Sequence, residues 1–245
     1  MVSYSKHIKP FFSPIPRKVE PEILDELSPL DEGAKQSRKD LVLINKIMGH
    51  ARLLSNALSE VMQKRGPIRI AEMGAGDGIL ATRIFKTFGQ VNAGSTLHFI
   101  DRSQTLAKEA RQPLERQGWQ VVEHVRDIQD WLDESTELLD ACYANLFLHH
   151  FDDASLKHLM HPLMRRTRQF VCCEPRRHRM GLLGAAGLRL LGCHDVTLHD
   201  AYVSVKAGFR ATELSSIWNS GAKEQWILSE RSSGLFSHFF KASAP

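Results

Sequence analysis

The sequence is poor in cysteine and contains no long apolar run. Its 245 residues include four cysteines, Cys142, Cys172, Cys173 and Cys193, and no Cys-x-x-Cys pair. Because these cysteines lie mostly in apolar stretches, we expect reduced thiols in the core and a cytoplasmic protein. The first residues contain no apolar segment of a signal peptide, and nowhere do 18 uncharged apolar residues run together, so neither secretion nor a membrane span is predicted.

The chain also lacks a strong charge of either sign. Its 32 Lys and Arg residues against 28 Asp and Glu residues give a net charge of only +4, and the basic residues are scattered. This composition does not indicate a nucleic-acid partner, although it leaves an RNA substrate open. With 42% apolar residues, the chain can bury one large core, and we expect one domain with an N-terminal extension.

Two common phosphate-binding motifs are absent from the most informative stretch, Glu72–Gly78. This stretch follows the apolar run Ile68–Met73 and precedes the helical pattern Ile79–Phe88, which predicts a strand, a glycine turn and a helix. The spacing does not match Gly-x-Gly-x-x-Gly, because Ile79 stands where the last glycine is needed. No Gly-Lys-Ser/Thr follows either, so the stretch is not a P-loop.

An acidic residue followed by Gly-x-Gly-x-Gly resembles the first motif of the class I S-adenosylmethionine (SAM) methyltransferases. SAM carries a sulfonium and no phosphate, so its turn needs space and carboxylates, which Glu72 and Asp77 supply. A plain glycine-rich strand-to-helix turn is the alternative. The resemblance implies that SAM is the cofactor and that it is bound by Glu72, Gly74, Ala75, Gly76, Asp77 and Gly78.

A second carboxylate ends the predicted strand Thr96–Asp101. Asp101 lies 23 residues after Gly78, and in the family an acid at this place accepts hydrogen bonds from the ribose hydroxyls; its neighbour Arg102 is included in the predicted site. The alternative is that Asp101 caps a helix starting near Ser103.

A third carboxylate, Asp127, follows the predicted strand Trp119–Val125. The family commonly uses a carboxylate here for the adenine amino group and the next backbone amide, that of Ile128, for the ring. Asp127 is equally suited to be the N-cap of the following helix, and the two interpretations stay open.

The segment Leu138–Asp153 begins as a buried strand and ends in polar residues. It resembles the fourth family motif, whose residues face the reacting methyl group, and its Leu-His-His-Phe-Asp sequence is common among small-molecule members. Asn145 is therefore predicted in the cofactor site and His149 and His150 as catalytic residues. A histidine with a pKa near about 6.5 can take a proton at neutral pH, whereas structural hydrogen bonding is the alternative.

Glu174 completes the predicted catalytic set, because the apolar strand Gln169–Arg177 brings it beside the two histidines if the two strands are neighbours in a parallel sheet. A metal site formed by His149, His150, Asp152 and Asp153 has no ordered ligand spacing, so no metal is expected.

Alternating strand and helix patterns, followed by a closing hairpin between 226–230 and 235–242, predict an α/β fold. The resemblance implies a three-layer αβα sandwich with a seven-stranded, mostly parallel sheet and a C-terminal antiparallel hairpin. We expect residues 1–65 to form an arm and helices covering the active site, including an irregular arm over 1–20 and one long helix over 37–64. Residues 66–245 then form the SAM-binding domain, with a helical insertion near 178–218.

The resemblance predicts a SAM-dependent methyltransferase that acts on O, N or an activated C of a small, partly apolar molecule. RNA or protein methylation and a non-catalytic SAM-binding partner subunit are the alternatives. The lack of Asn/Asp-Pro-Pro-Tyr after the fourth strand argues against an exocyclic amine of DNA or RNA. Acceptor choice is expected to lie in the N-terminal helices and in Met180–Arg210, with Arg38, Arg52, His199, Lys206 and Arg210 as candidate contacts.

Overall fold

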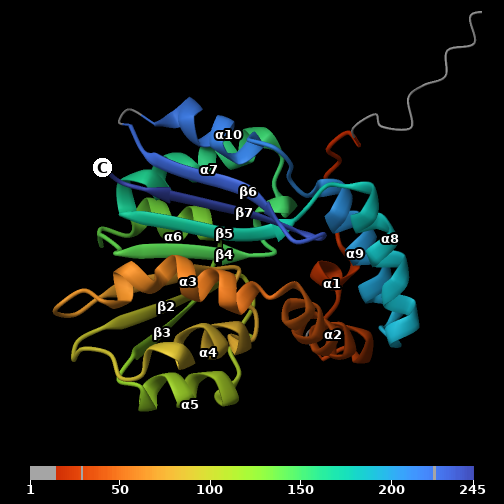
Figure 1. The fold of residues 1–245 in the computed structure, drawn as a ribbon. Coiled ribbons are helices and arrows are strands. Elements are labelled where there is room, and N and C mark those ends of the chain that lie inside the picture. Colours follow the sequence, from red (N-terminus) through yellow and green to blue (C-terminus); the bar gives the residue numbers. More distant parts are fainter. Residues whose placement is uncertain (1–14, 29, 223–224) are drawn as a thin grey trace, which may run out of the picture.

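A seven-stranded sheet forms the centre of the molecule (Figure 1). The computed structural model describes residues 15–28, 30–222 and 225–245. In the sheet the order is β3-β2-β1-β4-β5-β7-β6; neighbours among β1 to β5 are parallel, and β7 runs antiparallel to both β5 and β6. The strands are β1 Arg69–Met73, β2 Thr96–Asp101, β3 Gln120–Val125, β4 Ala141–Asn145, β5 Gln169–Pro175, β6 Ile227–Ser233 and β7 Ser237–Ser243.

Helices cover both faces of the sheet and give the three layers that the sequence predicts (Figure 1). On one face lie α3 His50–Met62, α4 Ile79–Phe85 with η1 Lys86–Phe88, and α5 Lys108–Arg116; on the other lie α6 Ile128–Glu134, α7 Asp153–Arg166 and α10 Glu213–Gly221. The predicted fold class and the closing hairpin are therefore confirmed.

The central strands are apolar on both sides because they are covered on both sides. In β1, Ala71 and Met73 belong to the core under α6, α7 and α10, whereas Ile70 belongs to the core under α3 and α4. All seven residues of β5 are buried. This explains why these strands read as near-continuous apolar runs without polar alternation, as is usual for parallel strands between two helix layers.

Four further helices form a lobe at one end of the sheet (Figure 1). The helix α9 lies at its centre and contacts α1, α2 and α8. These elements are α1 Ile23–Glu26, α2 Glu32–Met48, α8 Arg179–Gly187 with η3 Leu188–Leu191, and α9 Asp195–Ala207; η2 Leu148–His150 follows β4. Residues of this lobe and residues at the carboxyl ends of β1, β2 and β4 line the same cavities.

The prediction of one long helix over 37–64 is wrong, because the chain forms two helices here. Asp31 starts α2 earlier than expected by accepting a hydrogen bond from the backbone N–H of Ala34. Gly49 ends α2 with φ of 68°, a left-handed conformation that glycine adopts without a steric penalty. As a result α3 packs on the sheet, while α2 turns away and joins the lobe.

Among the residues that the structure describes, no helix combines the length and the apolar character that crossing a bilayer requires. The predicted irregular arm over residues 1–20 lies outside the described part except for 15–20. The four cysteines are free and buried, as expected.

Candidate active site

Two cavities that share part of their lining lie between the lobe and the carboxyl ends of the strands. The large cavity has a volume of about 890 Å³ and the small cavity about 460 Å³. They share walls from the glycine turn, the end of β2 and α1, namely Gly74, Gly76, Asp101, Arg102, Leu24 and Asp25. Of the predicted site residues, only Gly78 and Glu174 line neither cavity.

The three glycines of the turn have different structural roles, although all have positive φ angles: 66° at Gly74, 54° at Gly76 and 72° at Gly78. A Cβ on Gly74 would lie 2.3 Å from the Phe147 ring, and one on Gly78 would lie 2.5 Å from Leu106. A Cβ on Gly76 meets no atom within 4 Å, and Gly76 lines both cavities. Gly74 and Gly78 are therefore needed for packing, whereas Gly76 keeps the cavity open.

Asp101 links the second strand to the glycine turn. Its carboxylate accepts hydrogen bonds from the backbone N–H groups of Gly76 and Ser103, each at 2.9 Å. The alternative that Asp101 caps a helix near Ser103 is wrong, because α5 starts only at Lys108. Each carboxylate oxygen retains a further lone pair, and the residue lines both cavities.

Asp127 is the N-cap of α6, because its side chain accepts a hydrogen bond from the backbone N–H of Gln129 at 2.7 Å. It also lines the large cavity together with Ile128. The capping interpretation is thus confirmed, and a contact with a base in the cavity stays a prediction.

Glu72 and Asn145 form a polar wall of the small cavity. Burial raises the pKa of Glu72 to about 8, and the hydrogen bond from the Tyr143 hydroxyl, at 2.9 Å, only partly opposes this. The Asn145 amide donates to Asn45 Oδ1 at 2.9 Å, but its own buried Oδ1 has no partner among the described residues. A ligand with a cationic donor would satisfy both groups.

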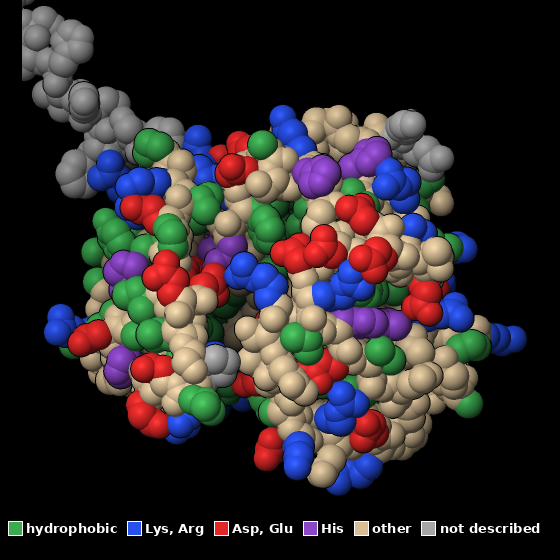
Figure 2. Space-filling model, turned by 180° about the vertical axis from the view of Figure 1, so that it is seen from behind, with side chains coloured by type: hydrophobic (Ala, Val, Ile, Leu, Met, Phe, Trp, Pro, Cys, Tyr) green, Lys and Arg blue, Asp and Glu red, His purple; other side chains and the backbone are tan. Residues whose placement is uncertain are grey.

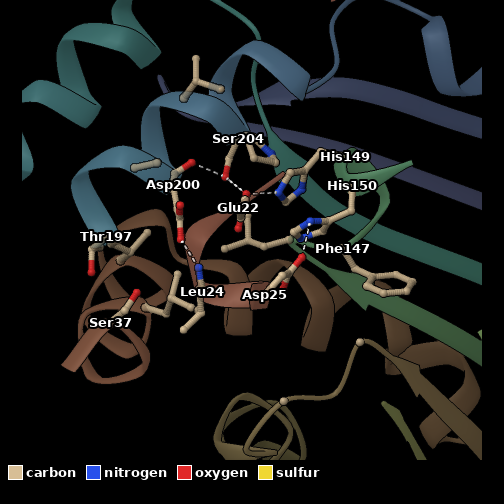
Figure 3. A pocket seen from close by; sticks show the side chains of 18 of the residues that line it. Glu22, Leu24, Asp25, Ser37, Phe147, His149, His150, Thr197, Asp200 and Ser204 are labelled. Atoms are coloured by element: carbon tan, nitrogen blue, oxygen red, sulfur yellow. Dashed lines mark hydrogen bonds and ion pairs between the residues drawn. The ribbon is translucent and has the colours of Figure 1, made fainter. Parts of the chain in front are cut away.

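His149 lies between two carboxylates, as Figure 3 shows for Glu22. Its Nδ1 is 2.8 Å from Glu174 Oε2 and its Nε2 is 3.1 Å from Glu22 Oε1. Burial by itself would lower the pKa of His149, but the hydrogen bonds with Glu174 and Glu22 outweigh burial and raise it to about 9. His149 is therefore an imidazolium at neutral pH that donates from both nitrogens.

Glu174 lies behind His149, as the predicted strand order requires. It is fully buried and also accepts hydrogen bonds from the backbone N–H groups of Phe147 and Leu148. Burial would raise its pKa, yet the hydrogen bond and charge of His149 and the backbone donors hold it below the usual range. Glu174 is thus positioned to hold His149 and does not face the cavity.

His150 lies beside His149 and lines the large cavity. Its Nδ1 is 3.3 Å from Asp25 Oδ2, and the two imidazole rings have centroids 4.3 Å apart. Burial and the positive charge of His149 lower the pKa of His150. The site therefore combines one charged and one neutral imidazole at neutral pH.

Sequence reasoning expected residues 1–65 to cover the active site but did not single out Glu22, which contacts His149. Asp200 of α9 accepts hydrogen bonds from the backbone N–H groups of Ile23 and Leu24, at 2.8 and 3.0 Å, and so holds α1 in place (Figure 3). Glu22 then reaches His149, 127 residues away in sequence, and also accepts from the Ser204 hydroxyl. No local sequence pattern predicts a contact between residues so far apart in the chain.

Glu22, His149 and His150 also offer ligand atoms within 4.8 Å of one another, which is the spacing of a cation site. Both nitrogens of His149 are already used by carboxylates, so the described contacts satisfy it without a cation. Asp152 and Asp153 are engaged elsewhere: Asp152 caps α7, and Asp153 pairs with Arg17. The expectation of no metal stays a prediction.

The predicted acceptor segments do line the large cavity, but most of their basic residues do not. Helices α2, α8 and α9 contribute mainly apolar and small side chains. Arg52, His199, Lys206 and Arg210 line neither cavity, and Arg38 lines the small one. Lys206 pairs with Glu20 and Arg210 with Glu213 instead.

Comparison with known proteins agrees with this geometry. Residues 70–169 match the family model of a methyltransferase domain. No curated protein matches the sequence.

The fold is similar to that of the plantazolicin methyltransferase BpumL in complex with SAH, with a TM-score of 0.60 at 12% identity over 87% of this chain and 90% of that chain. It is also similar to the magnesium protoporphyrin IX methyltransferase from Synechocystis PCC 6803 with bound SAH, with a TM-score of 0.51 at 14% identity over 80% and 84%. Residues 70–169 therefore match a methyltransferase domain, and the chain has the fold of the SAM-dependent methyltransferases to which it is similar.

Proposed function

We propose that this methyltransferase transfers a methyl group to a hydroxyl oxygen of a small, largely apolar molecule. The observation that carries the proposal is the large cavity, whose walls are mainly apolar and whose polar end holds His149 and His150. A concave apolar site with a few convergent polar groups is typical of small-molecule binding. An RNA or protein acceptor has less support, because basic residues contribute little to the walls.

The residues of the glycine turn fit SAM, which supplies an electrophilic methyl group on its sulfonium when bound. We propose that Glu72 and the unpartnered Asn145 Oδ1 bind its ammonium group, and that Asp101 binds the ribose hydroxyls. Gly74, Ala75, Asp77, Gly78 and Arg102 shape this part of the site. We propose that Asp127 and the backbone of Ile128 bind the adenine, since both line the large cavity.

We propose that the two histidines have different roles. The lowered pKa of His150 keeps its imidazole neutral, so that it can accept the hydroxyl proton. The charged His149, held by Glu22 and Glu174, is a positioning residue whose positive charge helps to keep His150 neutral. Neighbouring titratable groups with pKa values shifted in opposite directions are a common arrangement for acid and base roles.

The walls of the large cavity favour an acceptor that is apolar apart from its hydroxyl group. Four apolar side chains come from α2 and two from η3: Leu41, Ile44, Ile47, Met48, Leu188 and Leu191. Such walls bind hydrocarbon or aromatic surface through the hydrophobic effect. Binding the apolar part here also orients the hydroxyl toward the histidines, and orientation contributes much of the rate of such displacements.

The test is an assay for conversion of SAM to S-adenosylhomocysteine (SAH) with a panel of apolar phenols and enols, in parallel with amines, RNA and protein. The proposal expects turnover with members of the hydroxyl panel only, and its loss in His150→Ala with SAM affinity retained. Turnover with RNA or protein and none with the hydroxyl panel would contradict it.

A further inference from the structure

The outer side of α8 and η3 exposes a stripe of large apolar side chains. Met180, Leu183, Leu190 and Leu191 have exposed fractions of 41%, 64%, 92% and 55%. Their spacing of three or four residues, with Gly187 in between, places Met180, Leu183 and Leu190 on one side of the helical segment. A Cβ built on Gly187 meets no atom within 4 Å, so this side faces open space.

This stripe continues into the mouth of the large cavity. Leu191 and, from α2, Ile47 both line the cavity and are exposed, Ile47 at 54%. Leu43, one turn before Ile47, is also exposed. We call Leu43, Ile47, Met180, Leu183, Leu190 and Leu191 the leucine face. Its position means that an acceptor reaching the cavity past Ile47 and Leu191 meets apolar groups first.

The segments that carry the leucine face are basic. In α2, four basic residues, Lys35, Arg38, Lys39 and Lys46, outnumber the two acidic residues Glu32 and Asp40. The segment α8–η3 contains Arg179 and Arg189 and no Asp or Glu. Lys46 and Arg189 are exposed beside Ile47 and Leu190. In Figure 2 the surface is hollowed between two halves of the molecule, and hydrophobic side chains gather on the half to the left of the hollow.

Exposed apolar side chains on segments with an excess of Lys and Arg match the two contributions to binding at a lipid interface. Apolar side chains insert between lipids, and basic side chains attract anionic headgroups. A protein partner would also fit the apolar groups, but the net positive charge of both segments favours an anionic surface. An exposed apolar stripe of this kind is uncommon on a surface without a partner.

We propose that the leucine face docks on an anionic lipid bilayer and that the acceptor enters the large cavity from the membrane. The second part rests on the proposed function, because it takes the acceptor to be apolar. The proposal names lipophilic molecules with a hydroxyl as the substrate class. It requires only peripheral binding, in which α8, η3 and α2 lie at the membrane surface.

The first experiment measures cosedimentation of the full chain with vesicles of phosphatidylcholine, with and without phosphatidylglycerol. We expect binding to the anionic vesicles, weakened by salt. Leu190→Glu and Leu183→Glu, which line neither cavity, should each reduce binding at least about tenfold, because a carboxylate replaces an inserted side chain and repels the lipid. Lys46→Ala and Arg189→Ala should each reduce it roughly fivefold.

Ile227→Glu is the matched control, because Ile227 is 69% exposed and lies on β6, away from the lobe. It should leave vesicle binding unchanged. The proposal is overturned if the full chain does not bind anionic vesicles, if Leu190→Glu binds as well as the unchanged protein, or if Ile227→Glu loses as much. A dimer that Leu190→Glu dissociates, without vesicle binding, would assign the leucine face to self-association instead.

The second experiment separates docking from catalysis. Leu190→Glu should methylate a water-soluble acceptor at the normal rate, and should lose at least about tenfold in rate when the acceptor is embedded in anionic vesicles. Equal rates with embedded acceptor would contradict delivery from the membrane. Failure of the protein to methylate any hydroxyl would refute the proposed function, while vesicle binding would still test the docking surface.

Discussion

The site has two halves that are built in different ways. The glycine half, at the ends of β1 and β2, is fixed through its backbone: the N–H groups of Gly76 and Ser103 donate to the Asp101 carboxylate, and the turn packs against Phe147 and Leu106. The histidine half is fixed by charged side chains, since Glu22 and Glu174 hold His149 from opposite sides. The first half is part of the sheet, whereas the second is completed by α1.

This difference indicates a division of labour. A turn whose backbone N–H groups and glycines are held in this way can present the same shape to a cofactor whatever acceptor is bound. A group of coupled charged residues can respond to an acceptor and move protons. If the two halves are independent, substitutions in the glycine half should change cofactor affinity, and substitutions in the histidine half should change turnover.

The largest effect is expected in the histidine half. His150→Ala removes the proposed proton acceptor, so kcat should fall by about 10²–10⁴-fold while the Kd for SAM stays nearly unchanged. Single-turnover kinetics and calorimetry measure the two quantities. His161→Ala is a suitable control, because His161 lies exposed on α7 and lines neither cavity. Parallel losses of affinity and turnover in His150→Ala would mean that the halves are not separate.

The next effect belongs to the glycine half. Asp101→Ala should weaken SAM binding by about 1.5–3 kcal/mol, or roughly 10–150-fold, because hydrogen bonds to a charged group are lost. Asp101→Asn keeps one acceptor for the Gly76 N–H and should lose less. Calorimetry with SAM and SAH measures this. Normal affinity in Asp101→Ala would remove Asp101 from the proposed cofactor site.

The pH dependence of SAM affinity tests Glu72. Its pKa of about 8 means that it is largely protonated at pH 6 to 7, and a bound ammonium favours the carboxylate. Binding should therefore release a proton, and affinity should rise with pH between about 6 and 7.5, by up to about tenfold per pH unit. Glu72→Gln should bind more weakly and lose this slope. A slope that Glu72→Gln retains would assign the proton to another group.

The smallest effect concerns the contact between α1 and the histidines. The pKa of His149 in the folded protein, about 9, lies above its unfolded value near about 6.5. Its ion pairs therefore contribute stability that is fully present below pH 6.5 and is lost as pH rises through about 9. Glu22→Gln should cost about 1 kcal/mol at pH 6, and less above pH 9. Chemical denaturation at both pH values measures this, and a cost that does not change with pH would contradict the pairing.

The glycine half could be predicted because its signals are local. An apolar run, three glycines and a helical pattern fix β1, the turn and α4 within about twenty residues, and Asp101 follows at the end of the next strand. Even here the sequence alone did not show that the three glycines have different roles. The packing of Phe147 on Gly74 and of Leu106 on Gly78 distinguishes these two glycines from Gly76.

The histidine half could be predicted only in part. The placement of Glu174 beside His149 followed from the order of parallel strands. Glu22 could not be found, because α1 is held by Asp200 of α9, and this contact depends on how the whole lobe packs. The break between α2 and α3 had a local signal, Gly49, but the apolar periodicity on both sides of it favours one long helix.

The most direct test of the two halves is a crystal structure of the protein with SAH. Our account predicts ribose hydroxyls on Asp101, the ammonium group near Glu72 and Asn145 Oδ1, and the sulfur facing the part of the large cavity that holds His150. A sulfur directed away from His149 and His150, or a ribose held by residues of the histidine half, would contradict the account.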